Sequence, residues 1–161
     1  MVNDPQTPPW YETVVIPALL RRARATYGAA MREALAAIDC DDIPPNGMYI
    51  IGGLAMGAGG VPLTQLAKEL SVSKQGAGQL VDTLVLRGYL DRSVDTEDRR
   101  KLRITLTARG EAAAAAQAAA RDRVDAELTA RVGAATVTQM RKALGALTLI
   151  GRDAAGADGD E

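Results

Sequence analysis

VPLTQLAKELSVSKQGAGQLVDTLVLRGYLDRSVDTEDRRKLRITLTAR, residues 61–109, is the stretch that decides the fold. Its first half predicts two short helices with apolar residues at helical spacing, one capped by Thr64 and the next by Ser73. A Ser or Thr oxygen at a cap accepts backbone N–H groups that the first turn of a helix leaves unpaired. Gly88 follows the second helix, where a left-handed residue commonly ends one. Two short helices joined by a few residues form a helix-turn-helix.

Two segments of alternating apolar and polar residues follow the second helix. They are YLDRSV, residues 89–94, and KLRITLT, residues 101–107, and DTEDRR separates them. This alternation is typical of paired strands joined by a polar loop. A helix-turn-helix followed by a two-stranded hairpin is a winged helix, so we assign residues 61–109 to a winged-helix region.

The sequence before this region is predicted to be mostly helical. Residues 1–9 are Pro-rich and polar and are expected to be a disordered lead-in. Residues 10–60 form an N-terminal helical region whose long first helix starts near Trp10 and is broken or kinked at Pro17. Turn signals at residues 40–48 separate that helix from a short apolar one that starts at Tyr49.

Two further helices are predicted after the winged helix, at residues 110–152. Thr107 caps the first, an alanine-dense helix that runs to about Arg131, and Gly133 separates it from the last. Helices this long have nowhere to bury an apolar face in one chain, so they predict a partner. Residues 153–161 are expected to be a disordered acidic tail. The apolar stripe of the last helix consists of Val137, Met140, Leu144 and Leu147.

Composition narrows the class of protein. The 161 residues suit one domain, and 47% hydrophobic content with only 3% aromatic residues predicts a mainly α fold of the α+β class, with an aliphatic core. The chain has no His and one Cys, Cys40, so the usual zinc ligand sets and a disulfide framework are excluded, and we expect no metal or cofactor. The polar start and the lack of a long apolar run predict a cytoplasmic protein.

Positive charge is concentrated in the winged helix. The whole chain has a net charge of −1, whereas residues 63–109 hold nine basic and six acidic residues, a net charge of +3. Locally clustered cations of this kind indicate a surface that binds phosphates. We therefore expect the winged helix to bind nucleic acid.

Four residues at the start of the second short helix are candidates for reading DNA bases. The second helix of a helix-turn-helix presents its N-terminal residues to base edges in the major groove. Glutamine can pair with adenine and lysine can reach guanine, and a good pair discriminates by roughly 1–3 kcal/mol. The alternative is an ordinary polar helix face. The four candidates are Ser73, Lys74, Gln75 and Gln79.

Enzymatic interpretations have little support. Residues 71–74 spell S-x-x-K, a signature of penicillin-binding proteins and β-lactamases, but the companion motifs S-D-N and K-T-G are absent. Cys40 has no His in the chain to activate it. We expect no catalytic residues, and a role for Cys40 as a redox sensor stays open.

The segment DTEDRRKLRITLTARGE resembles the wing signature of the MarR family of bacterial transcription regulators, in which an Asp-Arg-Arg loop precedes a strand and a Leu-Thr pair. The order of the predicted helices and strands is also similar to that of the family. The resemblance implies a homodimer built from the N-terminal and C-terminal helices and bound to a pseudo-palindromic operator on double-stranded DNA. It also implies that the wing, residues 93–103, enters the minor groove with Arg99, and that Asp98 orients the neighbouring arginines. The sequence departs from the family pattern at Gly78 and Gln79, where relatives often have Ser and Arg.

The resemblance further implies a regulator, in most cases a repressor, that is released by a small aromatic or lipophilic ligand. Two alternatives stay open: a winged helix that binds proteins instead of DNA, and a regulator that responds to oxidation of Cys40. The remaining DNA-binding candidates are Thr64, Arg92, Asp98, Arg99, Arg100 and Arg103. The candidates for ligand binding are Trp10, Tyr11, Tyr27, Met31, Met48 and Tyr49.

Overall fold

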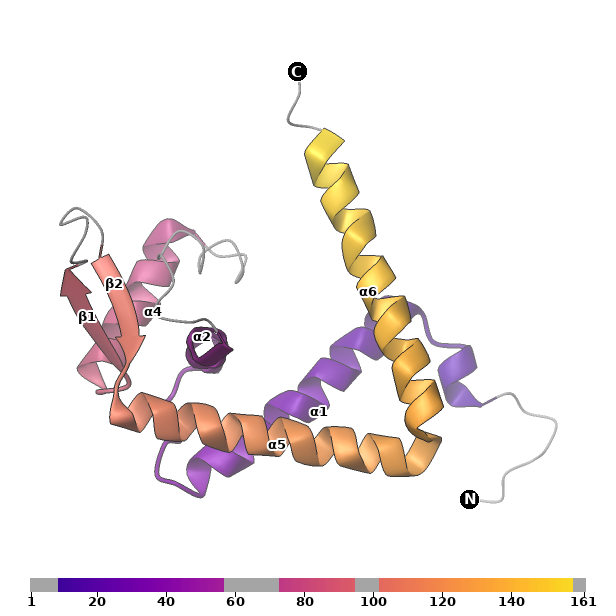
Figure 1. The fold of residues 1–161 in the computed structure, drawn as a ribbon, viewed down its shortest axis with the longest axis horizontal. Helices are drawn as coiled ribbons and strands as arrows, with labels where there is room; N and C mark the ends of the chain where they lie inside the picture. Colours follow the sequence, from indigo (N-terminus) through magenta and orange to yellow (C-terminus); the bar gives the residue numbers. More distant parts are fainter. Residues whose placement is uncertain (1–8, 57–72, 95–101, 158–161) are drawn as a thin grey trace. The chain divides into compact units, whose positions relative to one another are not determined.

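A computed structural model describes residues 9–56, 73–94 and 102–157 (Figure 1). The chain divides into two compact units, residues 1–121 and 122–161, and each is described by itself. The predicted first helix of the helix-turn-helix and the loop between the strands lie outside the described residues. The elements are η1 (Trp10–Glu12), α1 (Ile16–Ala36), α2 (Pro45–Met56), α4 (Lys74–Leu86), β1 (Leu90–Val94), β2 (Leu102–Leu106), α5 (Ala108–Val132) and α6 (Ala134–Ala157).

The break predicted at Pro17 is present. The segment from Trp10 forms a short 3-10 helix, and α1 begins at Ile16 with Pro17 in its first turn. Proline is tolerated there because the first N–H groups of a helix have no intrahelical partner. The apolar side chains of α1 are buried only near its C-terminal end, since Met31 and Leu35 lie in the core whereas Leu20 is 37% exposed.

The predicted boundary at residues 40–48 is too long. α1 ends at Ala36, and α2 already begins at Pro45, four residues before the expected start at Tyr49. Pro45 occupies the first turn, where a residue without an N–H breaks no hydrogen bond of the helix. A Pro-Asn-Gly sequence, which usually signals a turn, therefore begins a helix here.

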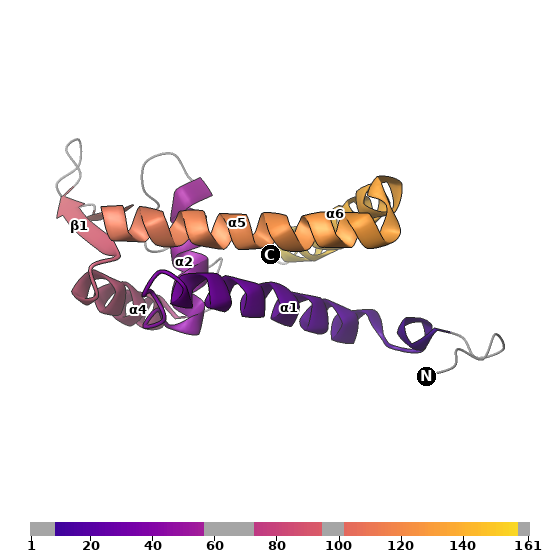
Figure 2. The same cartoon turned by 90° about the horizontal axis from the view of Figure 1, so that it is seen from below.

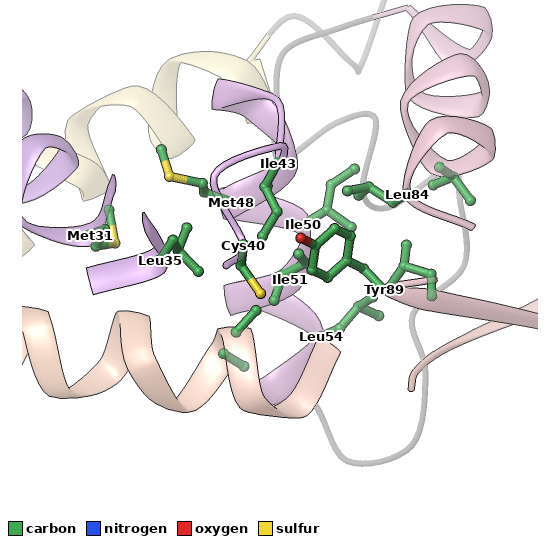
Figure 3. Packing of buried hydrophobic residues seen from close by; sticks show 14 of the residues in the cluster. Met31, Leu35, Cys40, Ile43, Met48, Ile50, Ile51, Leu54, Leu84 and Tyr89 are labelled. Atoms are coloured by element: carbon green, nitrogen blue, oxygen red, sulfur yellow. The ribbon is translucent and has the colours of Figure 1, made fainter. Parts of the chain in front are cut away.

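One core of apolar residues joins the elements of the first unit (Figure 3). α2 runs across α1 and the first half of α5 (Figure 2), and Ile50 and Ile51 of this helix are fully buried. Val81 and Leu84 of α4 are also fully buried. The aliphatic core expected from the composition is thereby confirmed, with Tyr89 as its one fully buried aromatic residue among those described.

The helix-to-hairpin corner has the predicted geometry. Gly88 adopts a positive φ of 74° after α4, its N–H donates to the Val85 carbonyl, and the Tyr89 N–H donates to the Leu84 carbonyl, both at 2.9 Å. This pair of hydrogen bonds closes the end of a helix. β1 and β2 then pair antiparallel, with Leu90 opposite Leu106.

A cluster of polar groups fixes this corner to α5 and to the turn between α1 and α2. The Arg109 guanidinium lies over the Tyr89 ring at 4.2 Å and donates to the Arg87 carbonyl at 2.6 Å and to the Asp42 carboxylate at 3.3 Å. The Tyr89 hydroxyl donates to the same Asp42 carboxylate. Burial first, and then this hydrogen bond, raise the pKa of Tyr89 far above its ordinary value.

Thr107 caps α5 as predicted. Its hydroxyl accepts the Gly110 N–H at 3.0 Å and donates to the Gly88 carbonyl at 2.6 Å. The second unit holds the end of α5 and all of α6, with a break at Gly133. α6 continues to Ala157, past the expected start of the tail at Asp153, because the alanines of this segment favour helix.

Gly110→Ala should destabilise the protein strongly. An added Cβ would lie 2.1 Å from the Tyr89 carbonyl oxygen, which is backbone and cannot move away alone. We expect the free energy of unfolding, measured by chemical denaturation, to fall by about 1–3 kcal/mol or more. Gly53→Ala is the matched control, because its Cβ would meet no atom within 4 Å. Equal stability of the two variants would contradict the close packing at Gly110.

Tyr89→Phe should change how stability depends on pH. The folded-state pKa of Tyr89 lies above the unfolded value of 10.0, so its contribution to stability is complete below about pH 10 and is lost as the pH rises further. Wild type should therefore lose more free energy of unfolding than Tyr89→Phe between pH 8 and pH 11. Identical pH profiles in urea titrations would show that Tyr89 ionises as freely in the folded protein as in the unfolded chain.

Candidate nucleic-acid interface

The N-terminus of α4 is capped as predicted. Ser73 has extended backbone angles, and its hydroxyl accepts the Gly76 N–H at 3.0 Å. The opposite face of the helix packs into the core through Ala77, Val81 and Leu84, all fully buried. Cap and core together fix the rotation of α4 about its axis.

The side of α4 that faces away from the core is polar. Gln75 and Gln79 are exposed and lie one helical turn apart, and the exposed Asp82 follows three residues later. We call Gln75, Gln79 and Asp82 the polar face of α4. Among the residues that the structure describes, no hydrogen bond joins the carboxamide of Gln75 or Gln79 to another side chain, so both amides are available to a partner.

The hairpin carries two exposed arginines, one of which contacts this helix. Arg92 of β1 forms an ion pair with Asp82 of α4, with Nη2 and Oδ1 2.5 Å apart. Arg103 of β2 is exposed and lies opposite Ser93 in the strand register. The structure thus brings Arg92 to the polar face, but in contact with a carboxylate that was not among the predicted site residues.

Several predicted DNA-binding groups cannot be placed. The backbone of Lys74 begins α4, but its side chain is not described. The other four lie wholly outside the described residues: Thr64, Asp98, Arg99 and Arg100.

Two of the nine cations counted in the winged helix are engaged in contacts within the protein. Arg109 is bound to Tyr89, Asp42 and backbone carbonyls, and Arg87 donates to the Asp42 carbonyl. The net charge of +3 therefore overstates the charge available to phosphates. No local pattern in the sequence reveals this, because Asp42 lies 47 residues before Tyr89 and 67 before Arg109.

The six candidate ligand-binding residues do not form one site. Met31 and Met48 are buried in the core, and Tyr27 packs against it. Tyr49 lies under Arg24, whose Nε donates to the Tyr49 hydroxyl at 3.0 Å. Trp10 and Tyr11 contact each other edge to face and are 61% and 53% exposed.

An open cavity of about 530 Å³ lies elsewhere in the first unit. The end of α2, strand β2 and the first half of α5 line it, with Leu54, Leu106 and Ala118 among its apolar walls. It includes none of the six candidates, and it borders Met56, the last residue described before residue 73.

The described part of the chain offers few other groups that could react or bind a metal. Cys40 is a free thiol that is only 3% exposed (Figure 3). No group of three or more metal-ligating side chains occurs among the residues with described positions. None of the described helices is long and apolar enough to cross a membrane.

Comparisons with known proteins agree with this architecture. The model of the MarR family matches residues 41–101. The FabT protein of Streptococcus pneumoniae, solved in complex with DNA, is similar in structure with a TM-score of 0.72 and 22% identity, over 86% of this chain and 96% of that one. RV1404 from Mycobacterium tuberculosis gives a TM-score of 0.66 and 26% identity, over 90% and 96% of the two chains.

The apo form of wild-type MarR from E. coli gives a TM-score of 0.63 and 21% identity, over 83% of this chain and 97% of that one. A search of functionally characterised sequences gave no match. A further similar structure, with a TM-score of 0.70 and 23% identity, is described as a MarR family transcription regulator and is matched over 88% of each chain. Residues 41–101 thus match the model of the MarR family, and the described elements share the winged-helix fold of the MarR-family structures.

Proposed function

We propose that the protein is a homodimeric transcription regulator that binds a specific double-stranded DNA sequence through α4 and the wing. The polar face of α4 is the observation that carries this proposal. It presents two unpaired glutamines at the capped end of a helix whose other face is locked into the core. An α-helix fits the major groove, and a glutamine carboxamide matches the donor and acceptor of adenine.

The wing supplies the second contact in this proposal. By resemblance to the family, residues 93–103 reach the minor groove, with Arg99 inserted, Arg100 beside it and Asp98 orienting both. Arg103 is exposed on β2, where it can contact the phosphate backbone. Arginine suits a narrow minor groove because the electrostatic potential there is strongly negative.

The second unit supports dimerisation. α6 carries the predicted apolar stripe on its surface, and Met140, Leu144 and Leu147 are 40%, 36% and 44% exposed in the single chain. A row of exposed apolar side chains on a long helix marks an interaction surface. In a dimer, two α4 helices would enter successive major grooves of a pseudo-palindrome, about 34–36 Å apart.

Repression is the regulatory outcome that we propose, because a dimer seated on an operator blocks access to the DNA beneath it. A small aromatic or lipophilic ligand would release the dimer if it bound one arrangement of the two reading helices more tightly than the other. This part of the proposal rests on the family resemblance alone.

The two alternatives are less well supported by the described residues. A winged helix that binds proteins should present apolar side chains at the start of α4, whereas Ser73, Gln75 and Gln79 are polar and exposed. A redox sensor at Cys40 needs an accessible thiol, whereas this one is buried.

The decisive experiment is DNA binding by the purified protein across a salt series. Wild type should prefer the duplex upstream of its own gene over a scrambled duplex, with affinity that falls steeply as salt rises. Gln79→Ala should lower affinity for the preferred duplex by about 5- to 150-fold, equivalent to roughly 1–3 kcal/mol, and leave the scrambled duplex unaffected. Gln139→Ala, the same change on α6, should have no effect. No sequence preference in wild type would refute the proposal.

Leu144→Asp should convert the dimer to a monomer. A charge in the apolar stripe of α6 would have to be desolvated in the interface. Sedimentation equilibrium should give the mass of one chain for this variant and of two for wild type, with unchanged helix content by circular dichroism. Gln139→Asp introduces the same charge on the same helix and should leave the dimer intact. A monomeric wild type would exclude this mode of DNA binding.

A further inference from the structure

We infer that Asp82 contributes to DNA specificity by holding Arg92 in an ion pair on the polar face of α4. The ion pair weakens the binding of DNA that lacks the preferred sequence. The inference rests on the proposed function, since it concerns the same DNA-binding face. Asp82 was not among the residues predicted from the sequence.

Asp82 lies where a carboxylate is least expected. It follows Gln79 by three residues and Gln75 by seven, so the three side chains share one side of the helix. The Asp82 side chain is 60% exposed. A duplex that approaches this face brings its phosphates toward a carboxylate, which repels them.

Arg92 reaches this carboxylate from the neighbouring strand. Its Nη2 atom lies 2.5 Å from Asp82 Oδ1, and its side chain is 35% exposed. In the strand register Arg92 is opposite Ile104, which is buried, so the guanidinium extends from the edge of the core toward α4. An ion pair this exposed contributes little to folding stability. Its main consequence is therefore for the charge of the surface and for the position of Arg92.

Arg92 can contact a DNA phosphate only if its ion pair with Asp82 breaks. An unpaired arginine on this face would bind the backbone of any duplex, because phosphate contacts carry no sequence information. While Asp82 holds Arg92, such a contact requires the ion pair to break. A non-cognate complex depends on phosphate contacts alone, so it either lacks the Arg92 contact or must break the pair to make it. A cognate complex gains affinity from base contacts to Gln75 and Gln79 and can leave the pair intact. Asp82 thus widens the difference in affinity between the two.

Asp82→Asn in the full-length protein tests this inference. Without the ion pair, Arg92 is free to bind one additional phosphate. Affinity for a scrambled duplex should rise about tenfold near 0.1 M salt, and the slope of log affinity against log salt should steepen by about one. Affinity for the preferred duplex should rise less, so that the ratio of the two affinities falls.

Two further variants separate the ion pair from the simple loss of a negative charge. Asp91→Asn removes the charge of an exposed acid next to Arg92 in β1 and leaves the Asp82–Arg92 pair in place. It should change both affinities equally and by less. The double variant Asp82→Asn with Arg92→Gln should return the scrambled-duplex affinity to the wild-type value, because the freed arginine is gone.

The outcomes distinguish this inference from the proposed function. If wild type prefers its upstream duplex but Asp82→Asn behaves like Asp91→Asn, the specificity role of Asp82 is wrong and the proposed function stands. A gain in affinity that persists in the double variant would also overturn the inference, since Arg92 would not be its cause. If wild type shows no preference, the proposed function itself fails.

Discussion

The contact of Arg109 with Tyr89 and Asp42 joins three parts of the chain that are far apart in sequence. Arg109 lies in the first turn of α5, Tyr89 follows α4, and Asp42 lies in the turn before α2. The guanidinium provides several donors in one plane, so a single side chain can bind the ring face, a carboxylate and backbone carbonyls together. Gly110 lets the backbone of α5 approach close enough for this, because a Cβ there would collide with the Tyr89 carbonyl.

The corner at Gly88 and Tyr89, between α4 and the hairpin, helps to fix the position of the whole of α4, including its N-terminal end. The helix is closed at its C-terminus by Gly88 and held along one face by Val81 and Leu84. Its N-terminal residues therefore project from a helix whose position and rotation are fixed. A binding surface on a rigid element loses little conformational entropy when it engages a partner. The polar face of α4 has this property because the corner and the core hold its other sides.

The sequence predicts most of the described fold because its signals are local. Ser73, Gly88 and Thr107 mark the ends of helices through hydrogen bonds to residues three positions away, and alternation marks the two strands. The start of α2 at Pro45 was missed because proline suits both a turn and the first turn of a helix. Only the tertiary fold decides between them.

The candidate site was predictable only in part, because its electrostatics arise from contacts between distant residues. Gln75 and Gln79 follow from their place at the start of a capped helix. The pairing of Arg92 with Asp82 joins a strand to a helix, and no periodicity in the sequence relates the two. The six candidate ligand-binding residues were grouped only because their side chains are large, and the structure distributes them between the core and separate surface contacts.

The division of the arginines has a consequence for affinity. Arg87 and Arg109 stabilise the corner, and Arg92 is paired with Asp82, so three cations of the winged helix are already engaged in the protein alone. Each phosphate contact that is absent from a complex reduces both its affinity and its dependence on salt. A single winged helix of this composition should therefore bind DNA weakly.

Useful affinity then requires base contacts and the simultaneous engagement of two winged helices, since the second binding event in a dimer is intramolecular. On this argument the exposed stripe of α6 matters for DNA binding as much as the polar face of α4, although it touches no DNA in the proposed complex.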